Sequence, residues 1–270
     1  AALKRQGLFD HVIGVGRSRA NMQQALSAGV IDEVAQDLAS AARDADLVLV
    51  AVPVRQTSGV LQQLRQCVAD GVVVTDAGST KRDFVQIAQE IFGSAEKNVV
   101  PGHPIAGAER SGVAAATTDL FTGKRVVLTP VPETDAKAVE RVASMWRACG
   151  ANVMQISPEH HDAVFSAVSH LPHVLSYALV EMIASRDNAE ELFSFAAGGF
   201  RDFTRIAGSS PEMWREICAA NADQELRDID AIQQALSLLA AYIRAGEMDK
   251  VEAVFAAAAK ARNAWGKGLK

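Results

Sequence analysis

The stretches LVLVAV, residues 47–52, and GVVVTD, residues 71–76, decide the fold class of this chain. Both are short and rich in valine, and neither alternates apolar with polar residues, which indicates strands buried on both faces of a sheet. The segment between them is long enough for a helical crossover. Strands of this kind joined by helices predict a mostly parallel sheet that helices cover on both sides.

The same pattern continues on both sides of these two strands. Further strand candidates are HVIGVG (11–16), NVV (98–100), RVVLT (125–129) and NVMQI (152–156). A helix is predicted over residues 136–149, because Val139, Val142 and Trp146 recur at helical spacing. We therefore expect an α/β domain over residues 1–157, built on a Rossmann-type doubly wound parallel sheet.

The second part of the chain has a different pattern. From Ser157-Pro158 onward strand signals stop, and residues with helical periodicity follow. Residues 158–270 are therefore predicted to form an all-α domain. Apolar positions such as Leu236 and Leu239 look exposed, which favours dimerisation of a helix bundle through this domain. A self-contained bundle is the alternative.

Composition restricts the classes of function. With 270 residues, 49% hydrophobic and 22% charged, the chain is typical of a soluble globular protein. Its net charge of -5 provides no general attraction for nucleic acid or an anionic membrane. The longest apolar run, Leu47–Val54, is too short to cross a bilayer. The cysteines Cys67, Cys149 and Cys218 lack disulfide or zinc spacing, so a reducing cytoplasm is expected.

The first residues do not complete a dinucleotide-binding motif. AALKRQG, residues 1–7, is typical of the last turn of a helix that Gly7 ends. In GVGRSR, residues 14–19, Arg19 stands where a complete G-x-G-x-x-G motif would have a small residue. We therefore interpret this strand as the second of the sheet, and expect the first strand and its glycine-rich loop to lie upstream of Ala1.

Residues after three strands are candidates for cofactor binding. Basic residues after a second Rossmann strand suit a ribose 2′-phosphate, whereas an acidic residue there would select the free hydroxyl. This favours NADP, with NAD possible, and a solvated basic loop is the alternative. Because ligands lie at the carboxyl ends of such strands, the candidates are Arg17, Ser18, Arg19, Val52, Pro53, Ala77 and Ser79.

Two motifs of the α/β part suit catalysis. In DAGSTK, residues 76–81, Ser79 could cap the helix that starts near Lys81 or hydrogen-bond a catalytic group. In GHPIAG, residues 102–107, His103 comes straight after a strand, in a segment too punctuated for helix or sheet. A histidine held there can take a proton near neutral pH. A structural turn histidine is the alternative.

The helical part contains further histidines. SHLPH, residues 169–173, places His170 and His173 on a helix interrupted by Pro172. No metal is expected, because no metal-binding pattern accompanies these histidines. His161-Asp162 is interpreted as a polar helix start.

Two arginines of the helical part stand at helical spacing. Arg201 and Arg205 lie in GGFRDFTRIAG, residues 198–208, shortly before Trp214. A guanidinium group can fix a carboxylate through two hydrogen bonds. A surface ion pair is the alternative, and it is favoured more for Arg201 than for Arg205.

Taken together, DAGSTK, GHPIAG, SHLPH and GGFRDFTRIAG resemble, in this order and spacing, the prephenate and arogenate dehydrogenases of tyrosine biosynthesis. The resemblance covers nearly the whole chain and implies a Rossmann-type domain followed by a helical dimerisation domain. It implies an oxidative decarboxylation that yields 4-hydroxyphenylpyruvate from prephenate or tyrosine from arogenate. The substrate stays open, because some relatives have threonine where this chain has Ala108.

The resemblance also implies roles for single residues. His103 matches the catalytic histidine of the family, which accepts the proton of the ring hydroxyl, and Ser79 matches the serine that orients it. Arg205 matches the arginine that binds a substrate carboxylate. His173 and Trp214 match residues of the substrate pocket.

Two other functions stay open. A different hydroxyacid dehydrogenase with Rossmann and helical domains would require a catalytic lysine in the helical domain, where no comparable motif has one. A non-catalytic homodimer that senses aromatic-pathway metabolites would bind ligand without turnover. The dehydrogenase hypothesis predicts a cytoplasmic, homodimeric, metal-free enzyme that prefers NADP.

Overall fold

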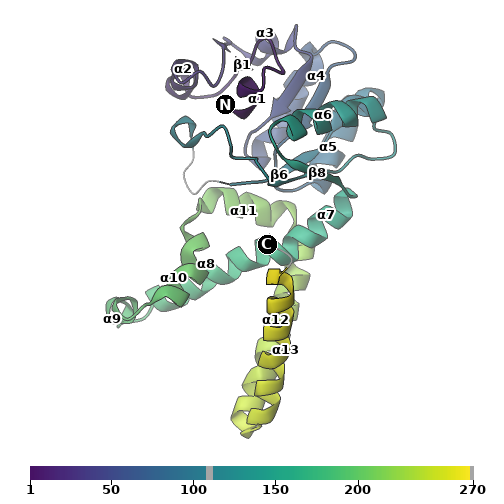
Figure 1. The fold of residues 1–270 in the computed structure, drawn as a ribbon. Coiled ribbons are helices and arrows are strands. Elements are labelled where there is room, and N and C mark those ends of the chain that lie inside the picture. The colour runs from purple at the N-terminus through teal and green to yellow at the C-terminus, as the bar shows by residue number, and fades with distance from the viewer. Residues whose placement is uncertain (108–111, 268–270) are drawn as a thin grey trace. The chain divides into compact units, whose positions relative to one another are not determined.

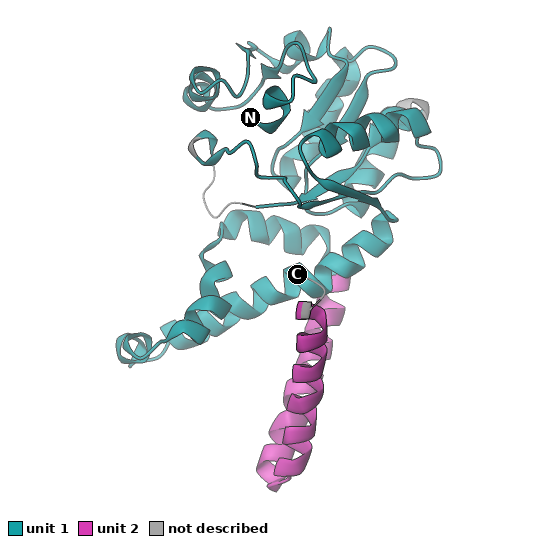
Figure 2. Cartoon of the chain, in the orientation of Figure 1, with its two compact units in different colours: residues 1–222 teal, residues 223–270 magenta. Residues whose placement is uncertain are grey.

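The chain forms two compact units. The computed structural model describes residues 1–107 and 112–267 (Figure 1). By backbone contacts, unit 1 is Ala1–Ala222 and unit 2 is Asp223–Lys270 (Figure 2). The division predicted after residue 157 falls inside unit 1, where the chain changes from strands and helices to helices alone. That division concerns the kind of element, not compactness, and it stays a prediction.

The strands of unit 1 form three small sheets. In the described residues they are β1 (Ile13–Gly14), β2 (Glu33–Val34), β3 (Leu47–Val50), β4 (Val73–Asp76), β5 (Val99–Val100), β6 (Gly102–Ile105), β7 (Arg125–Leu128) and β8 (Asn152–Gln155). β1 pairs with β2, β3 with β4, and β4 with β5, all in parallel. β7 pairs in parallel with β8 and antiparallel with β6. Each strand predicted from the sequence is confirmed, and β2 and β6 are additional.

Strand β6 corrects the prediction for the segment that contains His103. That segment was expected to be too punctuated for a sheet, but Gly102–Ile105 pairs with β7. Pro104 lacks an amide hydrogen, and β6 tolerates it because this strand lies at the edge of its sheet. A Cβ atom on Gly102 would lie 3.0 Å from the carbonyl oxygen of Asp76, so glycine allows β6 to approach β4.

Helices surround the strands of the α/β part. They are α1 (Ala2–Arg5), α2 (Arg19–Ser27), α3 (Leu38–Ala42), α4 (Thr57–Cys67), α5 (Arg82–Phe92) and α6 (Ala136–Ala148), with the 3-10 turns η1 (Val54–Gln56), η2 (Gly93–Asn98) and η3 (Val113–Ala115). The helical turn before Gly7 is confirmed by α1, after which Gly7 has a φ of 63°. The helix predicted over residues 136–149 is confirmed by α6.

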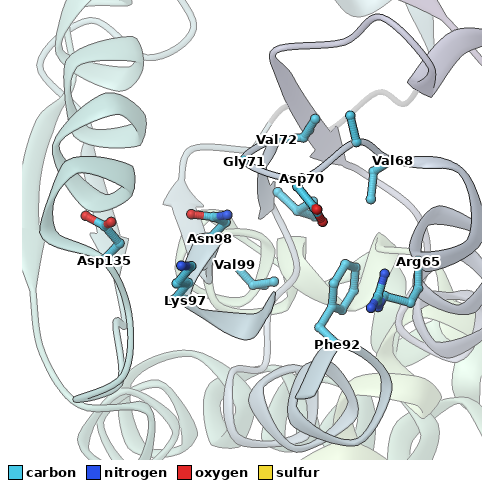
Figure 3. Close-up of a pocket in the computed structure, with 12 residues that line it drawn as sticks. Arg65, Val68, Asp70, Gly71, Val72, Phe92, Lys97, Asn98, Val99 and Asp135 are labelled. Carbon is cyan, nitrogen blue, oxygen red and sulfur yellow. The ribbon is translucent and has the colours of Figure 1, made fainter. Parts of the chain in front are cut away.

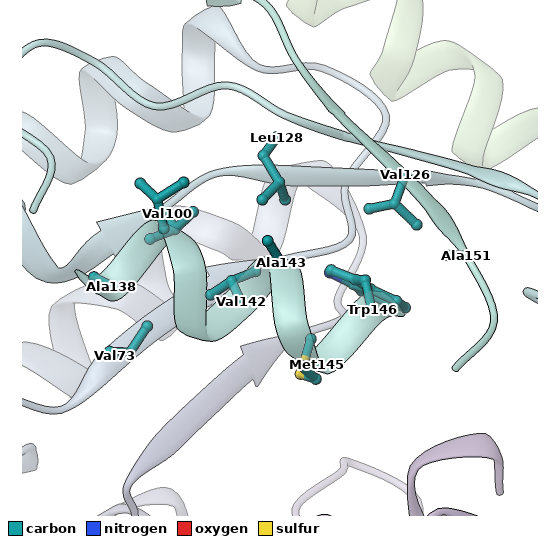
Figure 4. Packing of buried hydrophobic residues seen from close by; sticks show 11 residues of the cluster. Val73, Val100, Val126, Leu128, Ala138, Val142, Ala143, Met145, Trp146 and Ala151 are labelled. Atoms are coloured by element: carbon teal, nitrogen blue, oxygen red, sulfur yellow. The ribbon is translucent and has the colours of Figure 1, made fainter. Parts of the chain in front are cut away.

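The core of unit 1 lies on both faces of β4. Val73 belongs to a cluster that contains Trp146 of α6 (Figure 4). Its neighbour Val74 belongs to a second cluster, with Leu61 of α4 and Phe84 of α5. Successive side chains of a strand point to opposite faces, so β4 requires apolar residues in a row. The predicted covering of the sheet by helices on both sides is confirmed.

The second part of the chain is helical, as predicted. Its elements are α7 (Pro158–Phe165), the π-helical turn η4 (Ser166–His170), α8 (Leu171–Ala184), α9 (Ala189–Ser194), α10 (Gly198–Thr204), η5 (Arg205–Gly208), α11 (Pro211–Ala220), α12 (Ala222–Ala245) and α13 (Met248–Lys267). Within unit 2, Gly246 has a φ of 70° in the turn between α12 and α13.

One continuous helix of unit 1 is apolar. In the described part of the chain, Pro158–Ala184 is long and apolar enough to cross a membrane by length and composition, and only 17% of its most apolar window is buried. It does not stand out as an uninterrupted apolar run in the sequence, because histidines and serines interrupt it. Exposed apolar side chains such as Val168 are also what a subunit interface leaves open in a single chain.

A pocket of about 520 Å³ lies at the amino ends of β4 and β5 (Figure 3). Its charged lining residues are Arg65, Asp70, Lys97 and Asp135. Ligands of doubly wound sheets lie at the carboxyl ends of the strands, and the pocket contains no residue predicted for the site. The candidate site is therefore at the other edge of the strands.

Candidate active site

A buried ion pair organises the carboxyl end of β4. Lys81 Nζ donates to the Asp76 carboxylate, and also to the Gly102 carbonyl oxygen at 2.8 Å. The Asp76 carboxylate accepts from the amides of Gly102 and Gly78, each at 2.8 Å. Burial raises the pKa of Asp76, while the Lys81 charge and these amides oppose the rise. The ion pair therefore fixes the backbone of Gly78 and Gly102, the residues immediately before the predicted catalytic residues Ser79 and His103.

His103, His161 and Asp162 form a chain of hydrogen bonds. His103 Nδ1 lies 2.9 Å from His161 Nε2, and His161 Nδ1 lies 2.7 Å from Asp162 Oδ1. An ionised carboxylate only accepts, so His161 Nδ1 carries a hydrogen and Nε2 of the neutral ring accepts from His103. Nε2 of a neutral His103 is then without a hydrogen and can accept a proton.

The protonation states follow from the surroundings. Burial holds the pKa of His103 well below 6.5, and the charge of Lys81 lowers it further. Burial also lowers the pKa of His161, against the hydrogen bond to Asp162. Burial alone would raise the pKa of Asp162, but hydrogen bonds from His161 and from backbone amides outweigh it and lower this pKa. At neutral pH both histidines are therefore neutral and Asp162 is ionised.

Asp162 also caps helix α5 from a different helix. Oδ1 accepts from the amide of Lys81 at 2.9 Å, and Oδ2 accepts from the amide and Nε of Arg82 at 3.0 and 3.2 Å. The first amides of a helix have no partner within it. The prediction that Ser79 caps this helix is wrong, because α5 has no side-chain cap from its own segment and the Asp162 carboxylate fills this position. That Ser79 orients His103 stays a prediction.

The sequence interpretation of His161-Asp162 as a polar helix start needs correction. Both residues do lie near the start of α7, after the capping residue Ser157. However, both are fully buried, with 0% exposed. Their partner His103 is separated from His161 by 58 positions, so nothing local in the sequence indicates the contact. A histidine followed by an aspartate, at the fourth and fifth residues of α7, is the signal that could have drawn attention.

Two of the predicted substrate residues lie in contact. The rings of His173 and Trp214 are stacked, with centroids 3.6 Å apart. His173 Nδ1 donates to the Ser169 carbonyl at 2.8 Å, which leaves Nε2 for a ligand. Burial lowers the pKa of His173, and the nearby charge of Arg205 adds to this. Among the described residues, the buried Nε1 of Trp214 has no hydrogen-bond partner.

Asn221, which the sequence did not indicate, connects the substrate residues to the histidine chain. Its Nδ2 donates to the Asp162 carbonyl at 2.8 Å and lies 3.3 Å from His170 Nδ1. Its Oδ1 accepts from Arg82 at 2.8 Å. His170 packs edge-on against Trp214, with ring centroids 6.0 Å apart. Buried contacts therefore run without a break from the base to the stacked pair.

The π-helical turn η4 sets the relative direction of His161 and His173. These residues are 12 positions apart, which at 100° per residue would place them about 120° apart around a regular α-helix. One extra residue in a π turn removes about 100° of this difference. η4, at Ser166–His170, lies between them. With this turn, ideal geometry places the two histidines about 20° apart, whereas the sequence spacing alone predicts different faces.

The predicted cofactor residues lie after β1, β3 and β4, and Arg17 contacts Gln56 of η1, the turn that follows β3. Arg17, Ser18 and Arg19 are exposed at the start of α2, where Ser18 Oγ accepts from the amide of Asn21 at 3.2 Å. The Gln56 amide oxygen, in the orientation that satisfies its hydrogen bonds, accepts from Arg17 at 3.3 Å. Guanidinium groups beside a helix start suit a phosphate group. The residues present therefore fit the phosphate-bearing part of a nucleotide.

The remaining predicted residues lie at neighbouring strand ends. Val52 and Ala77 are half-buried after β3 and β4, and the Ala77 amide donates to the Val50 carbonyl at 3.0 Å. Pro53 is exposed and directly precedes η1. Ala108, where some relatives have threonine, lies outside the described residues. Within those described residues, no cluster of His, Cys, Asp and Glu suits a metal ion.

Two family models match consecutive parts of the chain. Residues 1–155 match the family model of the prephenate dehydrogenase nucleotide-binding domain. Residues 157–257 match the model of the prephenate dehydrogenase dimerization domain.

Individual relatives give the same result. The chain is 38% identical to the prephenate dehydrogenase of Bacillus subtilis over 94% of this chain and 68% of that protein. It is 35% identical to the cyclohexadienyl dehydrogenase of Zymomonas mobilis, over 86% of this chain and 79% of that protein. The A. aeolicus prephenate dehydrogenase, solved with hydroxyphenyl propionate and NAD+, has a TM-score of 0.86 and 36% identity, covering 94% of this chain and 88% of that chain. Arogenate dehydrogenase of Synechocystis has a TM-score of 0.82 and 25% identity, covering 98% and 94%.

Proposed function

The chain belongs to the prephenate dehydrogenase family, and we propose that it oxidatively decarboxylates prephenate or arogenate with a preference for NADP. The family and its relatives support an NAD(P)-dependent dehydrogenase acting in tyrosine biosynthesis. The products would be 4-hydroxyphenylpyruvate from prephenate and tyrosine from arogenate. The hydrogen-bonded chain of His103, His161 and Asp162 is the observation that carries this proposal.

The proposed role of His103 is that of a general base. Its Nε2 would accept the proton of the ring hydroxyl, while Nδ1 keeps donating to His161. The cation formed on His103 would be stabilised through His161 by the ionised Asp162. When bound, the nicotinamide supplies the hydride acceptor, and loss of carbon dioxide makes the ring aromatic. A positioned base is worth about 100- to 10,000-fold in rate.

The proposed substrate residues supply local positive charge and a flat apolar wall. Prephenate is a dianion, and the chain carries a net charge of -5, so binding requires cations placed at the site. Arg205 would bind a carboxylate through its guanidinium fork. The stacked His173 and Trp214 would form the wall, with His173 Nε2 directed to a ligand.

The proposed cofactor preference depends on the residues after β1. Arg17, Ser18 and Arg19 would hold the 2′-phosphate of NADP, with Val52, Pro53, Ala77 and Ser79 along the rest of the cofactor. The contact of Arg17 with Gln56 supports a cation at this position. NAD stays possible, since the A. aeolicus prephenate dehydrogenase was solved in complex with NAD+.

The assembly and location are part of the proposal. A homodimer through residues 158–270 is supported by the match to a dimerization domain and by exposed apolar side chains such as Phe195 and Val168. A cytoplasmic location agrees with the free cysteines Cys67, Cys149 and Cys218. The competing hydroxyacid dehydrogenase function is disfavoured, because no lysine of residues 158–270 stands in a motif comparable to the one that function requires.

A four-way assay tests the proposed function. The full-length protein, with any residues that precede Ala1, is mixed with prephenate or arogenate, each with NADP or NAD, and absorbance of the reduced cofactor is followed. We expect turnover, fastest with NADP. Binding of prephenate without turnover in any combination would contradict the proposal and favour the metabolite sensor.

We expect Arg17→Ala to reduce the preference for NADP over NAD. Hydrogen bonds to a charged group contribute about 1.5–3 kcal/mol, so the ratio of the two kcat/KM values should fall about ten- to a hundredfold. The measurement is kcat/KM with each cofactor. Arg43→Ala, at another exposed arginine, is the control. An unchanged ratio in Arg17→Ala would refute the 2′-phosphate role.

A further inference from the structure

A carboxylate outside the catalytic chain joins the substrate side of the site to its cofactor side. Glu216 lies on α11, two residues after Trp214, and only 6% of it is exposed. Its Oε2 accepts from the backbone amide of Arg55 at 3.2 Å. Arg55 belongs to η1, which follows the predicted cofactor residues Val52 and Pro53 directly.

The contact is specific for the start of a helix. η1 leads into α4, so the Arg55 amide is among the first amides of this helical stretch, which lack acceptors within it. The amide of the next residue, Gln56, bonds back to the Pro53 carbonyl at 2.9 Å. The Glu216 carboxylate therefore supplies an acceptor, and its negative charge suits a helix start.

Stability alone is a poor explanation for this carboxylate. Burying a charge costs free energy unless partners compensate it. The described partners of Glu216 are one amide and the more distant guanidinium of Arg215, 3.7 Å away, whose side chain is 61% exposed. A neutral acceptor of the same shape would cap Arg55 without that cost. Buried polar contacts of this kind set a unique geometry between the elements that they join.

Both ends of this contact belong to the machinery of the proposed function. On one side, Glu216 shares α11 with Trp214, which is stacked on His173. On the other side, η1 follows Pro53 and includes Gln56, which accepts from Arg17. We propose that Glu216 is a positioning residue, which fixes the cofactor-binding turn against the substrate-binding helix and so sets the distance for hydride transfer. This inference rests on the proposed function.

Glu216→Leu and Glu216→Gln form the matched test. Glu216→Leu removes the acceptor, and a misplacement of about 1 Å costs up to about a hundredfold in rate, so we expect kcat to fall by at least tenfold. The KM for prephenate should change less than kcat. The deuterium isotope effect on kcat, with the transferred hydrogen replaced, should rise because hydride transfer becomes slower than the other steps. Glu216→Gln keeps an acceptor and should restore kcat. Glu212→Leu, at an exposed glutamate of the same helix, should change none of these values.

The results separate this inference from the proposed function. If the wild-type protein turns over and a folded Glu216→Leu keeps its kcat and isotope effect, the positioning role is refuted. A Glu216→Gln variant as slow as Glu216→Leu would refute it too. If Glu216→Leu does not fold, hydrogen exchange of the wild-type Arg55 amide decides: protection supports the link, and fast exchange refutes it. Absence of turnover in the wild-type protein would instead refute the proposed function, and the exchange measurement would still test the link.

Discussion

His103→Asn should lower kcat by about 100- to 10,000-fold, which is the contribution of a positioned base. The asparagine amide nitrogen can take the place of Nδ1 and still donate to His161, so the neighbouring structure should be kept. What is lost is Nε2, the atom that would accept the proton. Steady-state turnover with prephenate and NADP measures the effect.

Substrate binding and pH dependence serve as controls for this result. His103→Asn should leave the Kd of prephenate nearly unchanged, whereas Arg205→Ala should weaken its binding, because the guanidinium fork proposed to hold a substrate carboxylate is lost. Because burial holds the pKa of His103 well below 6.5, wild-type kcat/KM should fall on acidification only below the usual histidine range. Full turnover in His103→Asn would remove this residue from the mechanism.

Lys81→Met should destabilise the protein by about 3–5 kcal/mol, because it leaves the Asp76 carboxylate buried without its partner. Lys81 is fully buried and donates to the carbonyl oxygen of Gly102, the residue before His103. We therefore expect the variant to lower kcat as well. Removal of its positive charge should raise the pKa of His103. The acidic limb of the kcat/KM profile should therefore shift to higher pH. Urea unfolding and the pH profile are the two measurements.

A double variant separates charge from packing. Asp76→Asn combined with Lys81→Met leaves no unpaired charge, and the amide oxygen of the new side chain can still accept from the Gly102 amide, as the Asp76 carboxylate does. We expect the double variant to recover most of the stability that Lys81→Met loses. If the double variant is as unstable as the single one, the loss comes from packing of the Lys81 side chain, and the ion-pair account is wrong.

The strands and the family could be predicted from the sequence because their signals are local. Consecutive valines in β4 indicate burial on both faces of the strand. The structure agrees, because Val73 and Val74 belong to separate hydrophobic clusters. His103 could be selected because it stands in a short motif. Its strand could not be predicted, because glycine and proline argue against a strand unless the strand is at an edge and must approach β4 closely.

The histidine chain and the Glu216 link could not be predicted, because their partners are far apart in the sequence. His161 is 58 positions from His103, and Glu216 is 161 positions from Arg55. Helical periodicity also fails across η4, since a π turn changes which residues share a face.

The sequence by itself determined the kinds of element, their order and the motifs that identify the family, because periodicity and local chemistry are properties of neighbouring residues. Only the tertiary structure decided which groups are hydrogen-bonded to one another, which histidine nitrogen is left to accept a proton, and which carboxylates are buried. Hydrogen bonds and desolvation act over a few ångströms in space. Packing of α7 against α5 and of α11 against η1 brings these groups together, although they are far apart in the sequence.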